Sequence, residues 1–167
     1  MDEPAQGVVA GRRGFTLPEI LIVVSLIGLG AAVAVPLISE AVRSARIRMA
    51  AQELAVSLRA ARMIAVSANR AVDVGIVVDD PTLGTYYEFL DNRGNQQRVT
   101  MPDAIRVDTG VSALALQFLP NGSVVNGPLQ VVLESGVFLG GALQSGERWT
   151  VETNTVGVTV VNHERVG

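Results

Sequence analysis

A run of nineteen apolar and small residues near the start of the chain limits most strongly what this sequence can fold into. The run extends from Ile20 to Ile38 and is interrupted only by one serine, two glycines and one proline. A helix of this length spans about 28 Å, at about 1.5 Å per residue, and the hydrocarbon core of a bilayer is about 30 Å thick. We therefore expect residues 15–38 to form a single transmembrane helix.

The charges that flank this run predict its orientation. Arg12 and Arg13 precede it in a segment, residues 1–14, that is otherwise mostly small or polar. Cytoplasmic flanks of membrane helices carry an excess of arginine and lysine. The sequence thus predicts that residues 1–14 stay in the cytoplasm and that everything after Ile38 is exported.

Composition removes several classes of function. A chain of 167 residues allows one modest domain with an appendage. It has no cysteine and a single histidine, His163, so disulfides, thiolate nucleophiles and multi-histidine zinc sites are excluded. Aromatic residues make up only 4% of the chain, too few for nucleic-acid stacking platforms. We expect no cofactor, no metal and no enzymatic activity.

Three interpretations of the N-terminus compete. The first is a twin-arginine-like signal at residues 12–17, with residues 32–34 (AVA) as the site for an ordinary signal peptidase. The second is an uncleaved signal anchor. Neither accounts for Glu19, because an ionised, unpaired carboxylate costs several kcal/mol in hydrocarbon and marks a functional residue with a partner.

The third interpretation follows from residues 14–19 (GFTLPE) and the apolar run behind them. This segment resembles the type III signal of type IV pilins and type II secretion pseudopilins. The resemblance implies that a prepilin peptidase cuts between Gly14 and Phe15, that Phe15 is N-methylated, and that Glu19 is needed for assembly. Pairing of the Phe15 amine with Glu19 of a neighbouring subunit offsets desolvation and fixes axial register.

Beyond the anchor we expect the helix to continue into the exported part. Pro36 removes a hydrogen bond and should kink the helix, and the resemblance agrees with a proline at this distance. Residues 39–69 show the spacing of an amphipathic helix that covers the globular domain. Its apolar stripe comprises Ile47, Ala50, Ala51, Leu54, Leu58, Ala61 and Ala65.

After residue 69 the apolar period changes from 3.6 to 2, which predicts strands in residues 70–167. Expected strands are 72–78, 85–90, 114–118, 129–133, 148–153 and 156–161, separated by turns rich in glycine, asparagine and proline. The predicted fold class is α+β: a long N-terminal helix, transmembrane in its first half and amphipathic in its second, packed on an antiparallel β-sheet or sandwich.

Several segments of the second half resemble the GspH/FimT branch of the pseudopilins. They are residues 60–62 (AAR), 69–74 (NRAVDV), 118–124 (FLPNGSV) and a closing hairpin from 150 to 160. The resemblance implies a minor pseudopilin of a type II secretion system, anchored in the inner membrane with its β-domain in the periplasm. Its partners would be the prepilin peptidase, other major and minor pseudopilins, the inner-membrane assembly platform and the lipid bilayer.

A FimT-like minor pilin that takes part in pilus assembly or DNA uptake is the alternative. Charge argues against nucleic acid as a partner, because residues 71–167 hold 5 Arg against 11 Asp and Glu, a formal −6. Residues 39–70 hold 6 Arg against 2 Glu, a formal +4.

The remaining polar residues of the exported part have ordinary roles. Asp79, Asp80, Asp91 and Asn92 carry oxygen atoms of the kind that binds calcium, but acidic residues in this setting are typical of turns. We expect His163, near a frayed C-terminus, to be solvated, and Trp149 to anchor the core or an edge.

Overall fold

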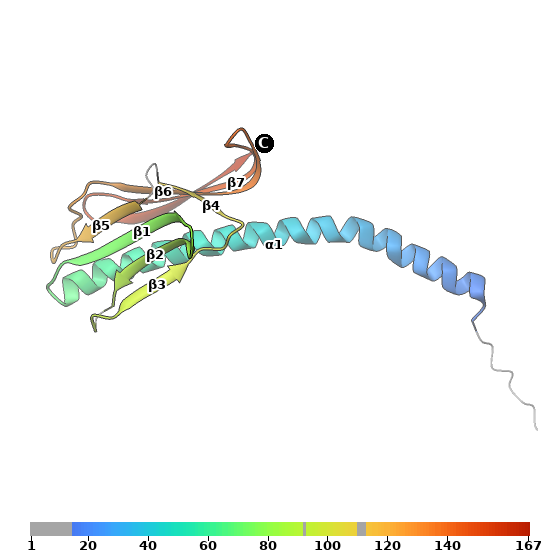
Figure 1. Cartoon of the computed structure of the whole chain (residues 1–167), viewed down its shortest axis with the longest axis horizontal. Helices are drawn as coiled ribbons and strands as arrows, with labels where there is room; N and C mark the ends of the chain where they lie inside the picture. The colour runs from blue at the N-terminus through green and yellow to red at the C-terminus, as the bar shows by residue number, and fades with distance from the viewer. Residues whose placement is uncertain (1–14, 92, 110–112) are drawn as a thin grey trace, which may run out of the picture. The chain divides into compact units, whose positions relative to one another are not determined.

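The computed structural model describes residues 15–91, 93–109 and 113–167 (Figure 1). One long helix, α1 (Leu17–Ser67), is followed by eight strands. The chain divides into two compact units, Met1–Ser39 and Glu40–Gly167, so the border between them falls within α1.

The described part of the first unit is helical from Leu17 onward. Its described side chains from Phe15 to Ser39 are all exposed, so none of them is buried by another part of the chain. Helix α1 is long and apolar enough to cross a membrane. The helix continues unbroken through Pro36.

The second unit contains the rest of α1, and here one face of the helix is covered. All seven residues of the predicted stripe are buried, which confirms it, and Leu54 and Leu58 are among the largest fully buried side chains. The helix ends at Ser67, two residues before the predicted end. Asn69 has a φ of 49°, and the amide of Arg70 donates to the Ala65 carbonyl, which is the Schellman arrangement that closes a helix.

Two four-stranded antiparallel sheets make up the β-half. The first contains β1 (Val72–Asp80), β2 (Gly84–Leu90), β3 (Gln96–Thr100) and β5 (Ala113–Phe118), in the order β3-β2-β1-β5. The second contains β4 (Arg106–Asp108), β6 (Leu129–Leu139), β7 (Ala142–Thr153) and β8 (Thr159–Val166), in the order β4-β6-β7-β8.

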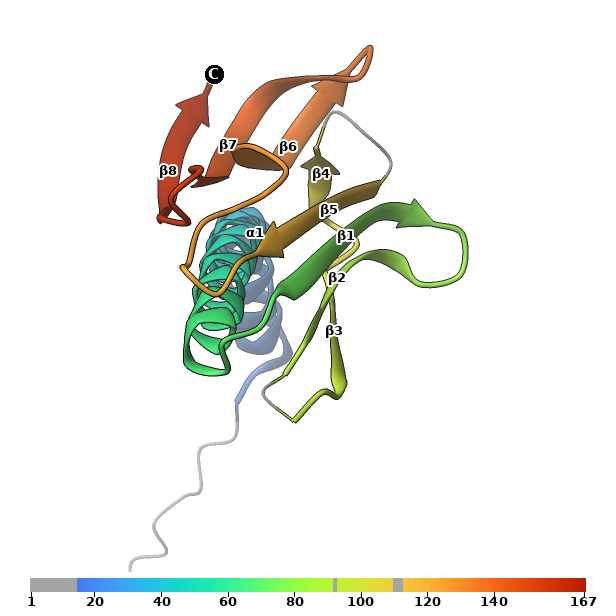
Figure 2. The same ribbon diagram turned by 90° about the vertical axis from the view of Figure 1, so that its left-hand side faces the viewer.

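The core of the second unit lies between its part of α1 and both sheets. Figure 2 looks along the helix and shows the two sheets curving around one side of it. Phe118, Leu133 and Val151, from β5, β6 and β7, pack with the helical stripe in one cluster. The α+β class predicted from the sequence is therefore confirmed, and of the predicted sheet or sandwich the structure has two sheets.

The structure corrects the predicted strands at three places. Strands β3 and β4 were not predicted, because one is mostly polar and the other has only three residues. Strand β6 runs through Gly136 to Leu139 because Gly146 lies opposite, and a side chain on either glycine would collide with the facing backbone. Residues 156–158 form a turn and not a strand, since Gly157 has a φ of 77° and Asn154 accepts the Val158 amide.

Candidate functional site: the exposed faces of the long helix

The start of α1 places Glu19 beside the backbone of the preceding turn. The Thr16 carbonyl accepts the first helical hydrogen bond, from Ile20, and the Thr16 amide donates to Glu19 Oε2 at 3.4 Å. This is half of a capping box, in which the residue three positions into the helix satisfies the amide of the cap. Sequence reasoning missed this contact, although residues 16–19 (TLPE) carry its signature.

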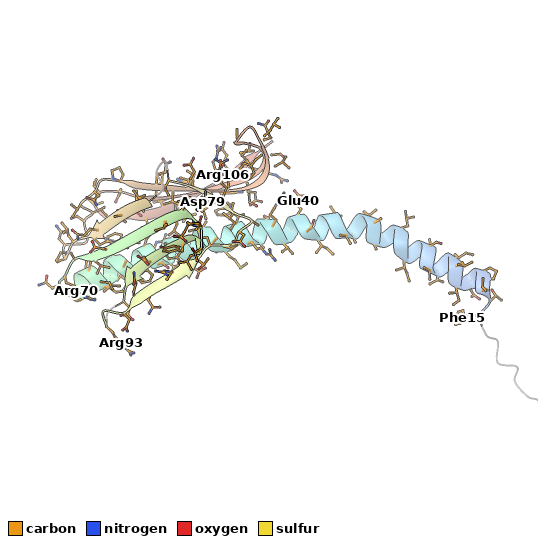
Figure 3. The ribbon with its side chains drawn as sticks, in the orientation of Figure 1. Phe15, Glu40, Arg70, Asp79, Arg93 and Arg106 are labelled. Atoms are coloured by element: carbon orange, nitrogen blue, oxygen red, sulfur yellow. The ribbon has the colours of Figure 1, made fainter. Side chains whose placement is uncertain are left out.

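Phe15 lies at the open end of the described chain, as Figure 3 shows, and 78% of its surface is exposed. Gly14, the other predicted cleavage residue, lies outside the described residues. Phe15 and Glu19 are thus placed within one turn of each other. The resemblance implies an ion pair between the Phe15 amine and the Glu19 carboxylate of neighbouring subunits. Both groups belong to the same end of the helix.

The apolar side chains that follow have no cover within the chain. Leu21, Leu26 and Leu29 are each more than half exposed, although each is large and apolar. Exposed apolar surface of this extent marks a membrane or protein contact. This half of α1 therefore requires lipid or the helices of other subunits around it.

A second apolar surface lies on the outer face of α1 in the second unit, opposite the buried stripe. Met49, Val56 and Met63 follow one another at intervals of seven residues and are 59%, 60% and 71% exposed. Beside Met63 a groove of about 520 Å³ is lined by Arg59, Arg62, Met63, Val66 and Ser67. The seven-residue spacing is visible in the sequence, but the stronger apolar stripe lies on the opposite face of the helix.

Two arginines of α1 hold the helix against distant parts of the β-half. Arg59 Nη2 donates to the Thr159 carbonyl at 3.0 Å, and Arg62 Nε donates to the Gly122 carbonyl at 3.0 Å. Gly157 packs against both Gly122 and Arg62, where a Cβ atom would collide with the Gly122 carbonyl. These bonds fix the helix against the start of β8 and the β5–β6 connection and leave its outer face free.

A polar network joins the helix to the second sheet. Ser44 Oγ donates to Glu147 Oε1 at 2.6 Å, and Trp149 Nε1 donates to Glu147 Oε2 at 3.1 Å. The hydrogen bond from Ser44, together with that from Trp149 and the nearby charges of His163 and Arg165, holds the pKa of the Glu147 carboxyl below its usual range. The network keeps the carboxylate ionised and the sheet fixed to this turn of the helix.

His163 is exposed, as predicted, but the expectation of a frayed C-terminus around it is wrong. Strand β8 extends to Val166, so the C-terminus does not fray before it, and the His163 ring stacks on Trp149 with 4.4 Å between ring centroids. His163 is therefore part of the network around Glu147 and not only a solvated side chain. Trp149 packs partly buried against the core, as predicted.

Deep inside the second unit, Tyr87 connects the first sheet to the helix. Its hydroxyl lies 3.1 Å from Ser57 Oγ. Burial raises the pKa of Tyr87 to about 12. The tyrosine stays neutral and serves packing.

The candidate calcium ligands that the structure describes lie at strand ends: Asp79 and Asp80 end β1, and Asp91 follows β2. Asp80 accepts the amides of Thr82 and Leu83, and these bonds lower its pKa. Asp91 accepts the amides of Arg93 and Asn95, which lower its pKa in the same way. Asn92 lies outside the described residues. Among the residues that the structure describes, no three histidine, aspartate or glutamate side chains gather to hold a metal ion.

The class of protein follows from the fold together with the anchor. Residues 10–35 match the model of the prokaryotic N-terminal methylation motif, and residues 50–157 match the model of the type II transport protein GspH. The first match covers the apolar segment and the second covers the outer part of α1 with most of the β-half. The fold and both matches define a pilin-like protein. The chain belongs to the GspH family of type II transport proteins.

A solved structure with a similar fold is the minor pseudopilin EPSH from the type II secretion system of Vibrio cholerae. It shares 16% identity with this chain, with a TM-score of 0.42, and the alignment covers 71% of this chain and 94% of that one. No curated protein sequence matches the chain.

Membership of this family defines the role of the chain. It is a minor pseudopilin of a type II secretion system, a structural subunit and not an enzyme. As a pseudopilin it is a substrate of prepilin peptidase and assembles with other pseudopilins. Its methylation motif and apolar helix are those of a prepilin anchored in the inner membrane.

Proposed function

We propose that the mature subunit begins at Phe15, crosses the inner membrane once and holds its β-domain in the periplasm. From there it enters the pseudopilus through two exposed faces of α1 and helps to export folded proteins across the outer membrane. The observation that carries the proposal is a 51-residue helix whose first part is apolar and exposed all round. Residues 1–14 would be the cytoplasmic leader that is removed.

Glu19 has two separable contributions in this proposal. Its carboxylate caps the helix through the Thr16 amide, and its charge pairs with the Phe15 amine of a neighbouring subunit. Inside a bundle of apolar helices an unpaired charge is costly, so the pair forms only when the two subunits are in register. The cap holds the carboxylate at the end of the helix, within reach of a neighbour.

The outer face of α1 in the second unit gives a second contact. Met49, Val56 and Met63 lie at the heptad spacing that lets one helix pack along another. We expect this face to receive a helix of the next subunit or of the assembly platform. Pro36 would loosen the helix between the two contact regions.

The test compares two substitutions of Glu19 in cells that secrete through this system. Glu19→Gln removes the charge and keeps an oxygen for the cap, whereas Glu19→Ala removes both. A photocrosslinking residue at Leu26, which is 64% exposed, reports contact with neighbouring subunits. Mass spectrometry of the purified subunits reports the mature N-terminus.

We expect both variants to be cut before Phe15 and to remain in the membrane, and both to lose the crosslinks and secretion. Unchanged crosslinking and secretion in the Glu19→Gln strain would show that the charge pair does not drive assembly. Loss in Glu19→Ala alone would assign the role of Glu19 to the cap. A mature N-terminus at Val35 would instead identify an ordinary signal peptide.

A further inference from the structure

Three arginines near the start of the second unit have no partner within the described residues. Arg43, Arg46 and Arg48 make no hydrogen bond or ion pair there through their side chains, and Arg46 and Arg48 are exposed. Of the other described arginines, all except Arg93 either donate to a carboxylate or backbone carbonyl or, as Arg165 does, form an ion pair. The acids that flank them along the helix are Glu40, which lies 3.9 Å from Arg165, and Glu53, five residues beyond Arg48. Three positive charges thus remain uncompensated on two turns of α1.

These arginines point in different directions around the helix. At about 100° per residue, Arg43 and Arg46 lie about 60° apart, and Arg48 lies about 140° to 160° away from them. A single phosphate, one face of a DNA duplex or one acidic patch on a protein cannot contact all three. A charged surface that surrounds the helix can.

Arg43 lies within the depth of a lipid headgroup layer, and Arg46 and Arg48 lie about one to two turns of helix beyond it. Arg43 follows Ile38, the end of the apolar run, by five residues, or about 7 Å of helix, and Arg48 by about 15 Å. The headgroup layer extends about 5–8 Å beyond the hydrocarbon on each side. Helical side chains lean toward the N-terminus, so Arg46 and Arg48 reach back toward that layer.

Apolar side chains lie at the same end of the second unit. The Glu40–Arg165 contact places the end of β8 beside the first turn of this unit's helix, and Gly146 of β7 pairs with Val166 of β8. The β6–β7 hairpin continues past that point and exposes Val137 and Leu139. Exposed apolar residues beside unpaired cations are typical of surfaces that rest on anionic membranes.

We propose that Arg43, Arg46 and Arg48 bind the headgroup phosphates of anionic phospholipids at the outer surface of the inner membrane. The inference rests on the proposed function, because it takes the end of the anchor to lie at that surface. The arginines do not set the orientation of the chain in the membrane, because positive charges on the exported flank oppose the predicted orientation. They hold the domain against the bilayer until the subunit is drawn into the filament.

The experiment uses the full chain reconstituted into vesicles that contain equal amounts of phosphatidylglycerol and phosphatidylcholine. Vesicle flotation after an alkaline wash reports insertion, and mass spectrometry of lipids retained by the detergent-extracted protein reports lipid preference. The variants are Arg43→Gln/Arg46→Gln/Arg48→Gln and the corresponding triple lysine variant. Arg93→Gln is the matched control, because the Arg93 side chain is also exposed and without a partner among the described residues but lies in the β2–β3 turn.

We expect the wild-type chain to retain phosphatidylglycerol over phosphatidylcholine by about fivefold for each headgroup contact, and less in high salt. The triple glutamine variant should fall to equal retention, the lysine variant should keep most of the preference, and Arg93→Gln should match the wild type. Circular dichroism of each variant confirms that the fold is intact.

Equal retention by the wild type, or an undiminished preference in the triple glutamine variant, would overturn the proposal. So would tight binding of a short DNA duplex through the same arginines without lipid preference, which would assign them to nucleic acid. Failure of the chain to float with vesicles of either composition would contradict the proposed membrane anchor instead. The two proposals can therefore fail separately.

Discussion

The two parts of α1 have the same secondary structure and opposite surroundings. Between Phe15 and Ser39 every described side chain is exposed, whereas beyond Glu40 the helix buries a stripe that includes Ile47, Leu54 and Leu58 at 0% exposure. A helix that is apolar all round needs lipid or other helices, and an amphipathic helix needs one covered face. One continuous helix is thus suited to two environments. Its first part has apolar residues all round, and its second part has a buried apolar stripe on one face.

Removing the first part is the strongest test of this division. We expect a chain without residues 1–38 to be soluble and mainly β, with cooperative unfolding, because both sheets and the buried stripe remain. Circular dichroism and a urea titration followed by Trp149 fluorescence measure this. Aggregation of the truncated chain without a cooperative transition would mean that the anchor contributes to the fold of the domain.

A matched pair of leucines sharpens the comparison. Leu54 is fully buried in the second unit, and Leu26 is 64% exposed in the first. Leu54→Ala should lower the free energy of unfolding of the domain by about 2–5 kcal/mol, because it leaves a cavity between the helix and the sheets. Leu26→Ala should leave it within about 0.5 kcal/mol of the wild type.

The measurement is urea unfolding of the full chain in a mild detergent. Contacts among subunits should show the reverse order: Leu26→Ala should alter them, whereas Leu54→Ala should alter the domain. Equal losses of domain stability in the two variants would contradict the separation of roles along the helix.

Much of the fold could be predicted because its signals are local. The stripe on α1 repeats at the helical period, and β1 and β5 alternate at the period of a strand. The missed strand β3 has mostly exposed polar residues and is held by pairing with β2, so its own sequence carries little signal. The extent of β6 depends on Gly146 of another strand, which no local pattern reveals.

Residues of the candidate site could be predicted where they belong to a sequence motif. They were missed where their contacts join residues far apart in the sequence. Phe15 and Glu19 stand out through the resemblance of the N-terminal segment to pilin signals. The contacts of Arg59 and Arg62 join residues 100 and 60 positions apart, and no spacing rule predicts them. The outer face with Met49, Val56 and Met63 was readable in the sequence, but an exposed stripe is recognised only after the covered one is known.

The smallest effect compares two serines, one in each part of the helix. Ser44 Oγ donates across to Glu147 of β7, whereas Ser25 Oγ donates to the Leu21 carbonyl of its own helix at 2.7 Å. Ser44→Ala should therefore lower the free energy of unfolding by about 1 kcal/mol, as the loss of one partly exposed hydrogen bond does. Ser25→Ala should leave domain stability unchanged, because its bond links no other element.

The two serine variants should also differ in how the free energy of unfolding depends on pH. The folded domain holds the pKa of Glu147 below the ordinary value of 4.5, so its contribution to stability is present above pH 4.5 and is lost as pH falls through the lowered pKa. Because the hydrogen bond from Ser44 is the largest cause of that lowering, Ser44→Ala should flatten this part of the stability–pH curve, measured by urea unfolding between pH 3 and 7. Ser25→Ala should keep the wild-type slope, since its bond is remote from any carboxylate of the domain. A Ser44→Ala curve parallel to the wild type would show that Trp149, His163 and Arg165 hold the carboxylate without the helix, and that the helix and sheet are joined here by packing alone.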